Sequence, residues 1–579
     1  MQTTHARFHP GALHRAGMFL AIATVALVLT TCSNPMLSTL QSVVEIAQRP
    51  RASIDFATGA GLASDTVITV TFSETMDPAT LTLGGTLAEH ASVSWSEGTP
   101  IDGAGSVPNV ILTIAPESTW PLGSGKGLTL DCQDTDTYEL ETLEVAYGVL
   151  NGIVYVHGEN GSDSNPGTID RPKKSIPDGV SAAQRVYDTA EGRVAGGTYQ
   201  TTSAVTVSDD ISLYGGYNPD NWNERDPATY ETVWSDLAYG THETLYYAAG
   251  VGAVTLDGFR IEAGNGEDSD GTAAIFVSSA SPIIRNNTIV AGVAGRAYGI
   301  TASAGSFQIS NNTFVTNSMV GISHPIYASE STVTISDNTI TGEMITEFFG
   351  IALEDCTAVV ERNRVNAGQP TSHAQCIYVD GGSATIRNNV LTGGNMISSD
   401  VIGQYGLFLN DCTVTVHSNT IDGGGGSSSD GIMATGIMLF YQVTSTIENN
   451  LIFTRGGADA DLFTGVWQVD AASFPRAFNN NVMFDCPDGN YYDEVNNDMY
   501  ALGIPNNLAA LESFINGSGG SAAANAFEIS GGLTTAPEYR PQAGSPDSIK
   551  TGGKTLSGFT DDIDGVTRTA PWSVGAYEY

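Results

Sequence analysis

IIRNNTIVAGVAGRAYGITASAGSFQISNNTF, residues 283–314, is the stretch of sequence that decides the fold. It holds two copies of a motif in which apolar residues precede and follow an Asn. Further copies continue along the chain, and the motif's Asn stands at eight positions: Asn287, Asn312, Asn338, Asn363, Asn389, Asn419, Asn450 and Asn481. Successive positions are 25, 26, 25, 26, 30, 31 and 31 residues apart, a regularity that indicates stacked repeats.

Two apolar columns flank the Asn column. One lies three residues before each Asn, as at Ile284, and the other lies two residues after it, as at Ile289. Because strands alternate their faces, both columns are expected to point into one core. The Asn marks a bend between two strands, where stacked amides can bond from coil to coil as in cross-β ladders.

A second apolar run precedes most of these motifs, for example YGIT from Tyr298 and FGIA from Phe349. One repeat therefore contains about three short strands, and repeats are expected to stack in parallel about 4.8 Å apart. The pattern over residues 251–485 resembles the repeats of the pectin-lyase-like superfamily. That resemblance implies a right-handed parallel β-helix with three strands per coil, and it raises the expectation of polysaccharide binding or cleavage.

The segments on either side of the repeats strengthen this interpretation. Residues 151–250 resemble the start and N-terminal cap of bacterial secreted β-helix proteins, which usually include a helix that plugs the solenoid. Ile176–Val180 (IPDGV) is a poor helix start, so we expect that plug to be short. Residues 486–579 are expected to hold the last coils and a cap. Their ending DIDGVTRTAPWSVGAYEY, residues 562–579, resembles the tail of surface-anchored β-helix proteins and is expected to protect the open strand edges.

Residues 51–150 contain short alternating runs such as TVITVTF, residues 66–72, separated by Gly, Pro and Asp clusters. About 100 residues of this kind predict a β-sandwich. The stretch VTFSETMDPATL, Val70–Leu81, resembles SbsA-type bacterial Ig-like domains, which act as spacers or adhesion modules. The whole chain is therefore expected to be all-β, with an Ig-like sandwich followed by the β-helix.

The N-terminus has the pattern of an export signal. Basic residues precede an apolar run, Met18–Leu29, which is too short to span a bilayer. The run ends before Cys32 in a sequence that resembles a bacterial lipobox, although Thr31 replaces the usual small residue. We expect residues 1–31 to be a lipoprotein signal peptide and residues 32–50 a tether. The protein would then be exported and lipid-anchored to the bacterial outer membrane or cell surface, with the N-terminal lipid as its only membrane contact.

The charge balance is strongly acidic: 63 Asp and Glu against 23 Lys and Arg, for a net charge of −40. Such a surface repels nucleic acid, which requires a basic face. It is compatible with specific Ca²⁺ sites or with an acidic surface that only aids solubility. The five cysteines after Cys32 include no CxxC pair and are expected to be buried small side chains: Cys132, Cys356, Cys376, Cys412 and Cys486.

A polar column lies two residues before the repeated Asn, on the outward face. Its charged members Glu361, Arg387, His417 and Glu448 could bind a glycan, or Glu361 and Arg387 could form a cross-strand ion pair. Glu361 and Glu448 are three coils apart, hence about 14 Å, too far for the carboxyl pair of a glycosidase.

A second candidate site follows the GI strands. Glu354 and Asp380 are expected on adjacent coils, where two carboxylates about 4.8 Å apart attract a cation. Together with Asp355 and Asp411 they could form a Ca²⁺ site, the one cofactor that the sequence indicates. The alternative is that these acids only form turns.

These observations predict a surface module that binds a polysaccharide or cell-surface glycan, or acts in adhesion, without catalysis. One alternative is a polysaccharide lyase or glycoside hydrolase acting in the groove of the β-helix. The other is a purely structural envelope protein. Fold alone does not decide among them.

Overall fold

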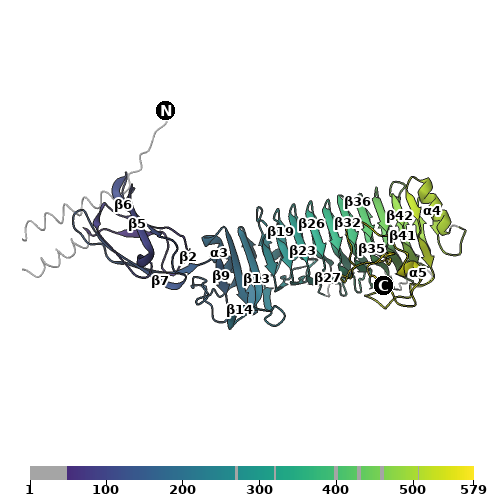
Figure 1. The fold of residues 1–579 in the computed structure, drawn as a ribbon, viewed down its shortest axis with the longest axis horizontal. Helices are drawn as coiled ribbons and strands as arrows, with labels where there is room; N and C mark the ends of the chain where they lie inside the picture. The colour runs from purple at the N-terminus through teal and green to yellow at the C-terminus, as the bar shows by residue number, and fades with distance from the viewer. Residues whose placement is uncertain are drawn as a thin grey trace, which may run out of the picture. The chain divides into compact units, whose positions relative to one another are not determined.

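A computed structural model describes residues 48–267, 271–317, 321–396, 402–426, 432–456, 462–505 and 507–579. The predicted signal peptide, Cys32 and nearly all of the tether lie outside these ranges. The chain forms two compact units, one ending at Asn151 and the other spanning Gly152–Tyr579 (Figure 1). No helix among the described residues is long and apolar enough to cross a membrane.

The first unit consists of two four-stranded sheets around a shared core, which makes it a β-sandwich. Strand alternation builds this core: Ile68, Val70 and Phe72 face inward from one sheet, and Leu128 and Leu130 from the other. The sheet orders are β1-β3-β6-β5 and β2-β8-β7-β4. The bounds are β1 Ala52–Ile54, β2 Gly61–Ala63, β3 Ile68–Phe72, β4 Met76–Gly84, η1 Ala88–His90, β5 Ala91–Gly98, β6 Val107–Pro116, β7 Gly123–Asp134 and β8 Leu143–Leu150.

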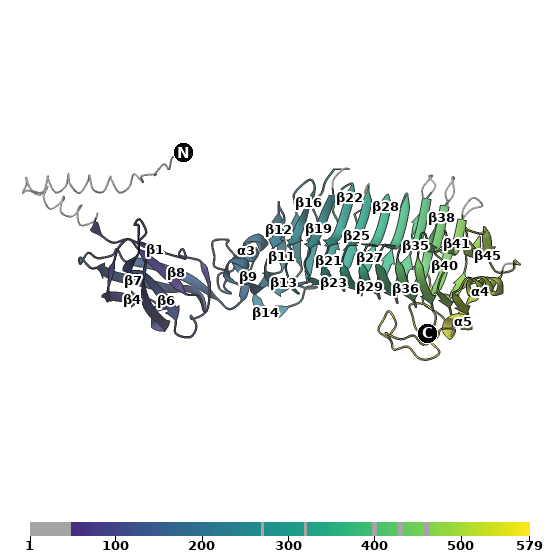
Figure 2. The ribbon, with the colours of Figure 1, turned by 90° about the horizontal axis from the view of Figure 1, so that it is seen from above.

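The second unit is a right-handed β-helix with three parallel sheets, as predicted (Figures 1 and 2). Each coil contributes one short strand to each sheet, in the order sheet 3, sheet 1, sheet 2. Sheet 1 contains β9 Ile153–Val156, β10 Thr189–Ala195, β13 Asp210–Asn218, β14 Asn221–Arg225, β17 Thr255–Asp257, β20 Ile283–Arg285, β23 Ser306–Ser310, β26 Thr332–Ser336, β29 Thr357–Glu361, β32 Ser383–Arg387, β36 Thr413–His417, β39 Thr444–Glu448, β42 Ala477–Asn479 and β46 Ser521–Ala523.

Sheets 2 and 3 complete each coil. Sheet 2 contains β11 Gly197–Thr201, β15 Thr232–Asp236, β18 Phe259–Glu262, β21 Thr288–Val290, β24 Thr313–Val315, β27 Thr339–Thr341, β30 Arg364–Asn366, β33 Val390–Thr392, β34 Asn395–Met396, β37 Thr420–Gly426, β40 Leu451–Arg455, β43 Val482–Phe484 and β47 Ala526–Glu528. Sheet 3 contains β12 Val205–Val207, β16 His242–Tyr247, β19 Gly271–Ser278, β22 Arg296–Ser303, β25 Ile322–Ser329, β28 Glu347–Glu354, β31 His373–Asp380, β35 Ile402–Asn410, β38 Ile432–Leu439, β41 Leu462–Gln468, β44 Gly489–Asp493 and β45 Asp498–Tyr500.

The repeated Asn residues form a continuous ladder inside the bend between sheets 1 and 2. The side-chain amide of Asn287 donates to Oδ1 of Asn312 at 3.1 Å, and each further Asn repeats this bond with the next coil at 2.9–3.2 Å. The ladder continues to Asn525, which follows Asn481 by 44 residues. Because these amides are buried and fully bonded, the ladder fixes the coil register.

The N-terminal plug is longer than the sequence indicated. Helix α3 spans Ile176–Val186 and packs on the first strands of the β-helix. Ser175 caps the helix by accepting a hydrogen bond from the backbone N–H of Asp178, and Pro177 lies in the first turn. Proline is favoured there, because the N–H it lacks would have no helical partner. The IPDGV stretch is therefore a regular helix start, and the expectation of a poor one was wrong.

The C-terminal end also differs from expectation. Helix α4, Leu508–Gly517, packs on β45 and β46 at the last coil (Figure 1). The tail that follows, which includes α5 Asp547–Lys550, lies along the side of earlier coils. Its backbone carbonyls accept hydrogen bonds from turn side chains of those coils: Asn388 to Asp561, Asn449 to Lys554 and Asn480 to Gly552. The tail thus covers the side of the coils, and α4 covers their open edge.

Candidate functional site

The outer face of sheet 3 carries two columns of aromatic side chains. In the first, the His324 ring lies between Tyr298 and Phe349, with ring centroids 5.1 Å and 4.9 Å apart and nearly parallel planes. Each of these residues follows a buried neighbour along its strand, as Tyr298 follows Ala297 and Phe349 follows Phe348, so the rings point outward.

The second column lies beside the first. Tyr327, Tyr378 and Phe408 belong to it through the strand register, and Phe440 follows Phe408 at 5.3 Å between centroids. Ala352 stands between the two tyrosines in this column. Its small side chain leaves space between their rings.

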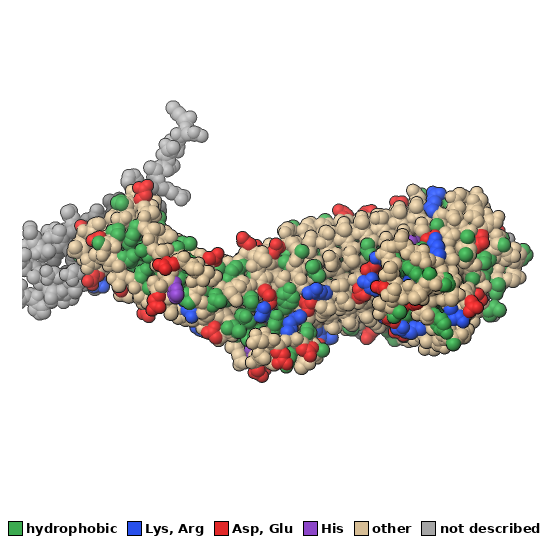
Figure 3. Space-filling model, viewed as in Figure 1, with side chains coloured by type: hydrophobic (Ala, Val, Ile, Leu, Met, Phe, Trp, Pro, Cys, Tyr) green, Lys and Arg blue, Asp and Glu red, His purple; other side chains and the backbone are tan. Residues whose placement is uncertain are grey.

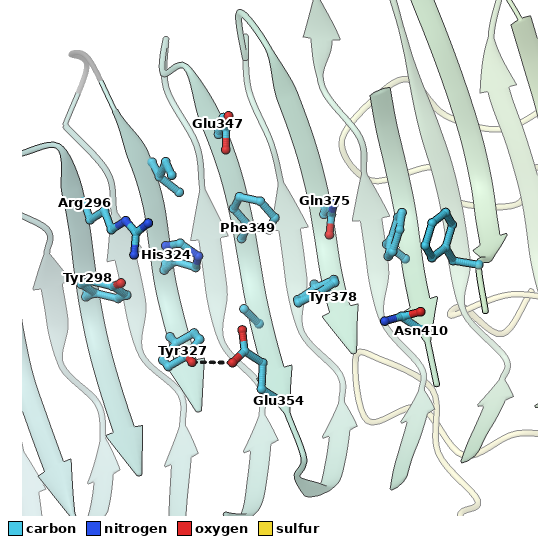
Figure 4. A pocket seen from close by; sticks show the side chains of 14 residues that line it. Arg296, Tyr298, His324, Tyr327, Glu347, Phe349, Glu354, Gln375, Tyr378 and Asn410 are labelled. Carbon is cyan, nitrogen blue, oxygen red and sulfur yellow. Dashed lines mark hydrogen bonds between the residues drawn. The ribbon is translucent and has the colours of Figure 1, made fainter. Parts of the chain in front are cut away.

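The two columns line a shallow depression of about 530 Å³ on this face (Figure 4). Polar side chains border the rings along the depression. The lining residues are Arg296, Tyr298, Ile322, His324, Tyr327, Glu347, Phe349, Ala352, Glu354, Gln375, Tyr378, Phe408, Asn410 and Phe440. Concave surfaces with apolar walls and a few convergent polar groups are typical of ligand sites.

Glu354 lines one side of the depression, and Asp380 stands beside it on the next strand. Glu354 and Asp380 are register partners on β28 and β31, so their coils are adjacent. The Tyr327 hydroxyl donates to Oε2 of Glu354 at 2.7 Å (Figure 4), and the Tyr378 hydroxyl donates to Oδ2 of Asp380 at 2.9 Å. Asn410 donates to Oδ1 of Asp380 at 2.7 Å. These bonds hold both carboxylates in place as hydrogen-bond acceptors.

The ionisation of the other groups follows from burial. Burial raises the pKa of both tyrosine hydroxyls, and the nearby carboxylates raise it further, so Tyr327 and Tyr378 remain proton donors. Burial between two rings lowers the pKa of His324 to about 4, and Arg296 adds to this shift. His324 is therefore neutral at pH 7.

Several buried polar atoms in the lining have no hydrogen-bond partner among the described residues. They are Nδ1 of His324, Oε1 of Gln375 and Oδ1 of Asn410. Unsatisfied buried atoms are rare in native proteins and cost free energy, and they concentrate at functional sites.

The four predicted calcium ligands do not form a metal site. Glu354 and Asp380 are adjacent but bonded to tyrosines, whereas Asp355 and Asp411 occupy left-handed turn positions after the strands, with φ of 51° and 42°. The Asp355 carboxylate lies against Gly381 of the next turn. In the part of the chain that the structure describes, no three His, Cys, Asp or Glu side chains are arranged to hold a metal. Because the strand face and the turn direct these side chains differently, the structure does not bring the four acids together, and calcium binding by them stays a prediction.

The predicted glycan stripe lies on the outer face of sheet 1, with Glu361, Arg387, His417 and Glu448 in successive register. Arg387 approaches Glu361 at 2.6 Å, and Arg362 approaches it at 2.9 Å. Glu361 and Arg387 therefore form the cross-strand ion pair that the sequence offered as the alternative to glycan binding.

The C-terminal tail covers this stripe. Arg387 donates to the Gly558 carbonyl at 2.8 Å and lies over the Phe559 ring, and Lys554 pairs with Glu448. His417 approaches Glu448 at 3.5 Å, and burial lowers the pKa of its imidazole. Figure 3 shows acidic and basic side chains close together where the tail lies. These charges already have protein partners, so the stripe is not an open binding surface.

The five cysteines of the described residues are buried, and none of them forms a disulfide: Cys132, Cys356, Cys376, Cys412 and Cys486. Burial raises the pKa of the thiols, to about 12 for Cys132. None of these thiols is a candidate nucleophile.

The sequence interpretation missed the aromatic columns. Its second apolar runs were interpreted only as strands, yet most of them carry an aromatic residue directly before Gly or directly after the central Ile or Leu. Examples are Tyr298, Phe349 and Phe408. Large outward rings repeated on successive coils were the signal that could have revealed this face.

The comparisons with known proteins support the fold. Residues 349–497 match the family model of the right handed beta helix region. No curated protein matches the chain. Among solved structures, the catalytic domain of a GH87 alpha-1,3-glucanase in complex with tetrasaccharides is 11% identical, with 72% of this chain and 96% of that chain covered and a TM-score of 0.17. The GH136 lacto-N-biosidase from Eubacterium ramulus is 10% identical, with 65% and 68% covered and a TM-score of 0.16. Scores this low carry no argument about function.

Proposed function

We propose that this chain is a glycan-binding surface protein whose ligand lies on the outer face of sheet 3. The observation that carries the proposal is the depression lined by two aromatic columns. Sugar rings present apolar C–H faces that pack on aromatic rings, while their hydroxyls need nearby acceptors and donors. Glu354, Gln375 and Asn410 supply such groups in the lining, and Asp380 stands next to it, bonded to Tyr378 and Asn410. An extended, shallow site of this kind suits a polymer better than a small enclosed ligand.

Binding assays with the full chain test this proposal. The protein would be titrated with neutral, acidic and amino oligosaccharides in a calorimeter. Tyr378→Ala should weaken binding of the preferred oligosaccharide by about tenfold, because one stacking ring is lost. Phe276→Ala is the matched control, since Phe276 lies in the same column of sheet 3 but outside the depression. Equal effects of the two substitutions, or no binding of any oligosaccharide, would refute the proposal.

A second candidate function is glycan cleavage by Glu354 and Asp380. It is favoured by their adjacency, because retaining glycosidases place two carboxyls about 5–5.5 Å apart. Against it, both groups accept tyrosine hydrogen bonds, whereas a general acid must donate a proton. Mass spectrometry of each oligosaccharide after incubation with the protein distinguishes cleavage from binding. Shorter fragments that disappear with Asp380→Asn would establish cleavage, and intact oligosaccharides would establish binding alone.

We further propose that the protein is exported and anchored through a lipid on Cys32. Support comes from the apolar run Met18–Leu29 and its lipobox-like ending. The first unit would then act as a spacer between the anchor and the β-helix. Mass spectrometry of the N-terminal peptide from membranes should find a lipidated Cys32, and Cys32→Ala should release the protein. An unmodified Cys32 in membrane-bound protein would contradict this.

A further inference from the structure

Two polar side chains flank Phe349 in the first aromatic column. The strand register places His324 one coil before Phe349 and Gln375 one coil after it. The strands of His324 and Gln375 are therefore two coil spacings apart, roughly 9.6 Å. All three side chains line the depression (Figure 4). This column thus offers a ligand one aromatic ring between two hydrogen-bonding groups.

Each of these polar side chains has a buried atom without a hydrogen-bond partner. The exposed fraction of Gln375 is 6%, and its Oε1 atom accepts no hydrogen bond from any described residue. The Nδ1 atom of His324 likewise has no partner within the described ranges. Unsatisfied buried atoms cost free energy, and native proteins satisfy nearly all of them. Two such atoms on either side of one ring therefore indicate groups that a ligand satisfies.

The tyrosine hydroxyls of the second column already donate hydrogen bonds within the protein. Tyr327 donates to Glu354, and Tyr378 donates to Asp380. Beside them, Oδ1 of Asn410 is a further buried acceptor that lacks a partner in the described part of the chain. A ligand that satisfies this oxygen or the amide oxygen of the glutamine must donate an O–H or N–H group. Sugar hydroxyls are such donors.

The charges of the lining disfavour an acidic ligand. The lining contains the carboxylates of Glu347 and Glu354 and one guanidinium, that of Arg296. His324 adds no positive charge at pH 7, because burial lowers the pKa of its imidazole to about 4. A carboxylate or sulfate on the ligand is repelled by the two glutamates. Such a group also accepts hydrogen bonds without donating any, so it leaves the amide oxygens of the lining unsatisfied.

We infer that the glycan bound on sheet 3 bears no acidic groups, and that one of its sugars lies against Phe349 with hydroxyls bonded to Gln375 and His324. This inference rests on the proposed glycan-binding function and names the class of glycan and the residues that select it. The C–H groups of the sugar pack against the ring, and its hydroxyls reach the polar atoms on either side. Gln375 then stabilises the bound state alone, since only a ligand satisfies its acceptor.

Calorimetry with matched hexaoses tests the inference on the full chain. The probes are hexaoses of glucose and of mannose, and the glucuronate and mannuronate hexaoses that differ from them only by oxidation of the hydroxymethyl groups. In the pair that binds, the neutral hexaose should bind at least about tenfold tighter, because the lining repels carboxylates. Gln375→Met keeps the length of the side chain but removes the acceptor, and should weaken binding of the neutral hexaose about tenfold. His324→Phe keeps the ring stack and should also weaken it.

Thermal unfolding without sugar distinguishes a ligand-binding glutamine from a structural one. Gln375→Met should leave the Tm unchanged or raise it, because the substitution removes a buried atom that has no partner among the described residues. A structural role for Gln375 would instead lower the Tm. Gln308→Met is the matched control, since Gln308 is an exposed glutamine on β23 of sheet 1 and should affect neither binding nor Tm.

The outcomes separate the two proposals. Binding of a neutral hexaose that Tyr378→Ala weakens and Gln375→Met leaves unchanged would overturn the inference and leave the glycan-binding function intact. Tighter binding of a uronate hexaose than of its neutral counterpart would overturn the inference as well. Weaker binding together with a lower Tm in Gln375→Met would assign Gln375 to the fold and not to the ligand, and would also overturn it. No binding of any hexaose would overturn both proposals.

Discussion

The outer faces of sheets 1 and 3 belong to the same coils, yet their acidic side chains differ in whether they are paired and covered. On sheet 1, Glu361 and Glu448 are paired with basic side chains and covered by the C-terminal tail. On sheet 3, Glu354 and Asp380 have no basic partner within the described part of the chain, and aromatic rings surround them. The difference teaches that an outward polar column is accessible to a ligand only where the protein leaves its charges unpaired and uncovered.

Detaching the tail should have the largest effect, and it should affect sheets 1 and 2, on which the tail packs, rather than sheet 3. Arg568 is buried, donates to Asn388, Gly575 and Ala576, and pairs with Glu578. Arg568→Ala leaves these buried partners unsatisfied and should destabilise the second unit by about 3–5 kcal/mol. Urea unfolding and limited proteolysis of the tail would measure this, with the more exposed Arg540→Ala as control. Oligosaccharide binding should persist at sheet 3. If the folded variant no longer bound oligosaccharide, the two faces would not be independent of each other.

The histidines of the two faces should differ in their pH response. The folded-state pKa of His324 is about 4, below the ordinary 6.5, so the unfolded chain binds the proton more readily. The stabilising effect of neutral His324 is therefore complete above pH 6.5 and is lost as the pH falls toward 4, by about 3 kcal/mol.

His324→Phe keeps the ring stack and should flatten this decline in urea unfolding measured between pH 6.5 and 4. His417→Phe should flatten it less, because the Glu448 carboxylate opposes the effect of burial on the pKa of His417. An equal change in both variants would show that the depression does not impose a special environment on His324.

Neutralising one acid on each face should have opposite consequences. Glu361→Gln removes the charge that Arg362 and Arg387 share and should cost about 1–2 kcal/mol of unfolding free energy. Glu354→Gln should leave stability unchanged or raise it slightly, because it relieves repulsion from Asp380. Thermal unfolding of the two variants provides the comparison. A larger loss of stability for Glu354→Gln than for Glu361→Gln would mean that a cation pairs with Glu354 on sheet 3.

Removing one tyrosine hydroxyl should have the smallest effect. Tyr327→Phe deletes the bond to Glu354 and should lower stability by less than about 1 kcal/mol, since water can replace the donor at this half-exposed site. The same change should weaken oligosaccharide binding on sheet 3, because the Glu354 carboxylate is no longer held in place. Tyr246→Phe, in the same column but outside the depression, is the control. A stability loss without a change in oligosaccharide binding would assign Tyr327 a structural role only.

The parts of the fold that could be predicted are those with a local signal repeated many times. The Asn ladder followed from spacing alone, because each Asn stands between two core positions of its own coil. Asn525 was missed because helix α4 interrupts the spacing before it. Helix α3 was expected to be shorter than it is, because the proline and glycine near its start looked unfavourable for a helix, whereas Ser175 caps it.

The sequence by itself determined the repeat, the three-strand coil and the core columns, since strand alternation is a property of neighbouring residues. It could not determine which outer face stays open. That depends on contacts between distant residues, such as Arg387 with Gly558, 171 positions later. Only the tertiary structure shows that the tail neutralises and covers the polar stripe of sheet 1 and leaves the rings and carboxylates of sheet 3 uncovered. The physical reason is that charge pairing and burial depend on distances between side chains in the folded structure, whereas the repeat pattern depends only on the order of residues along the chain.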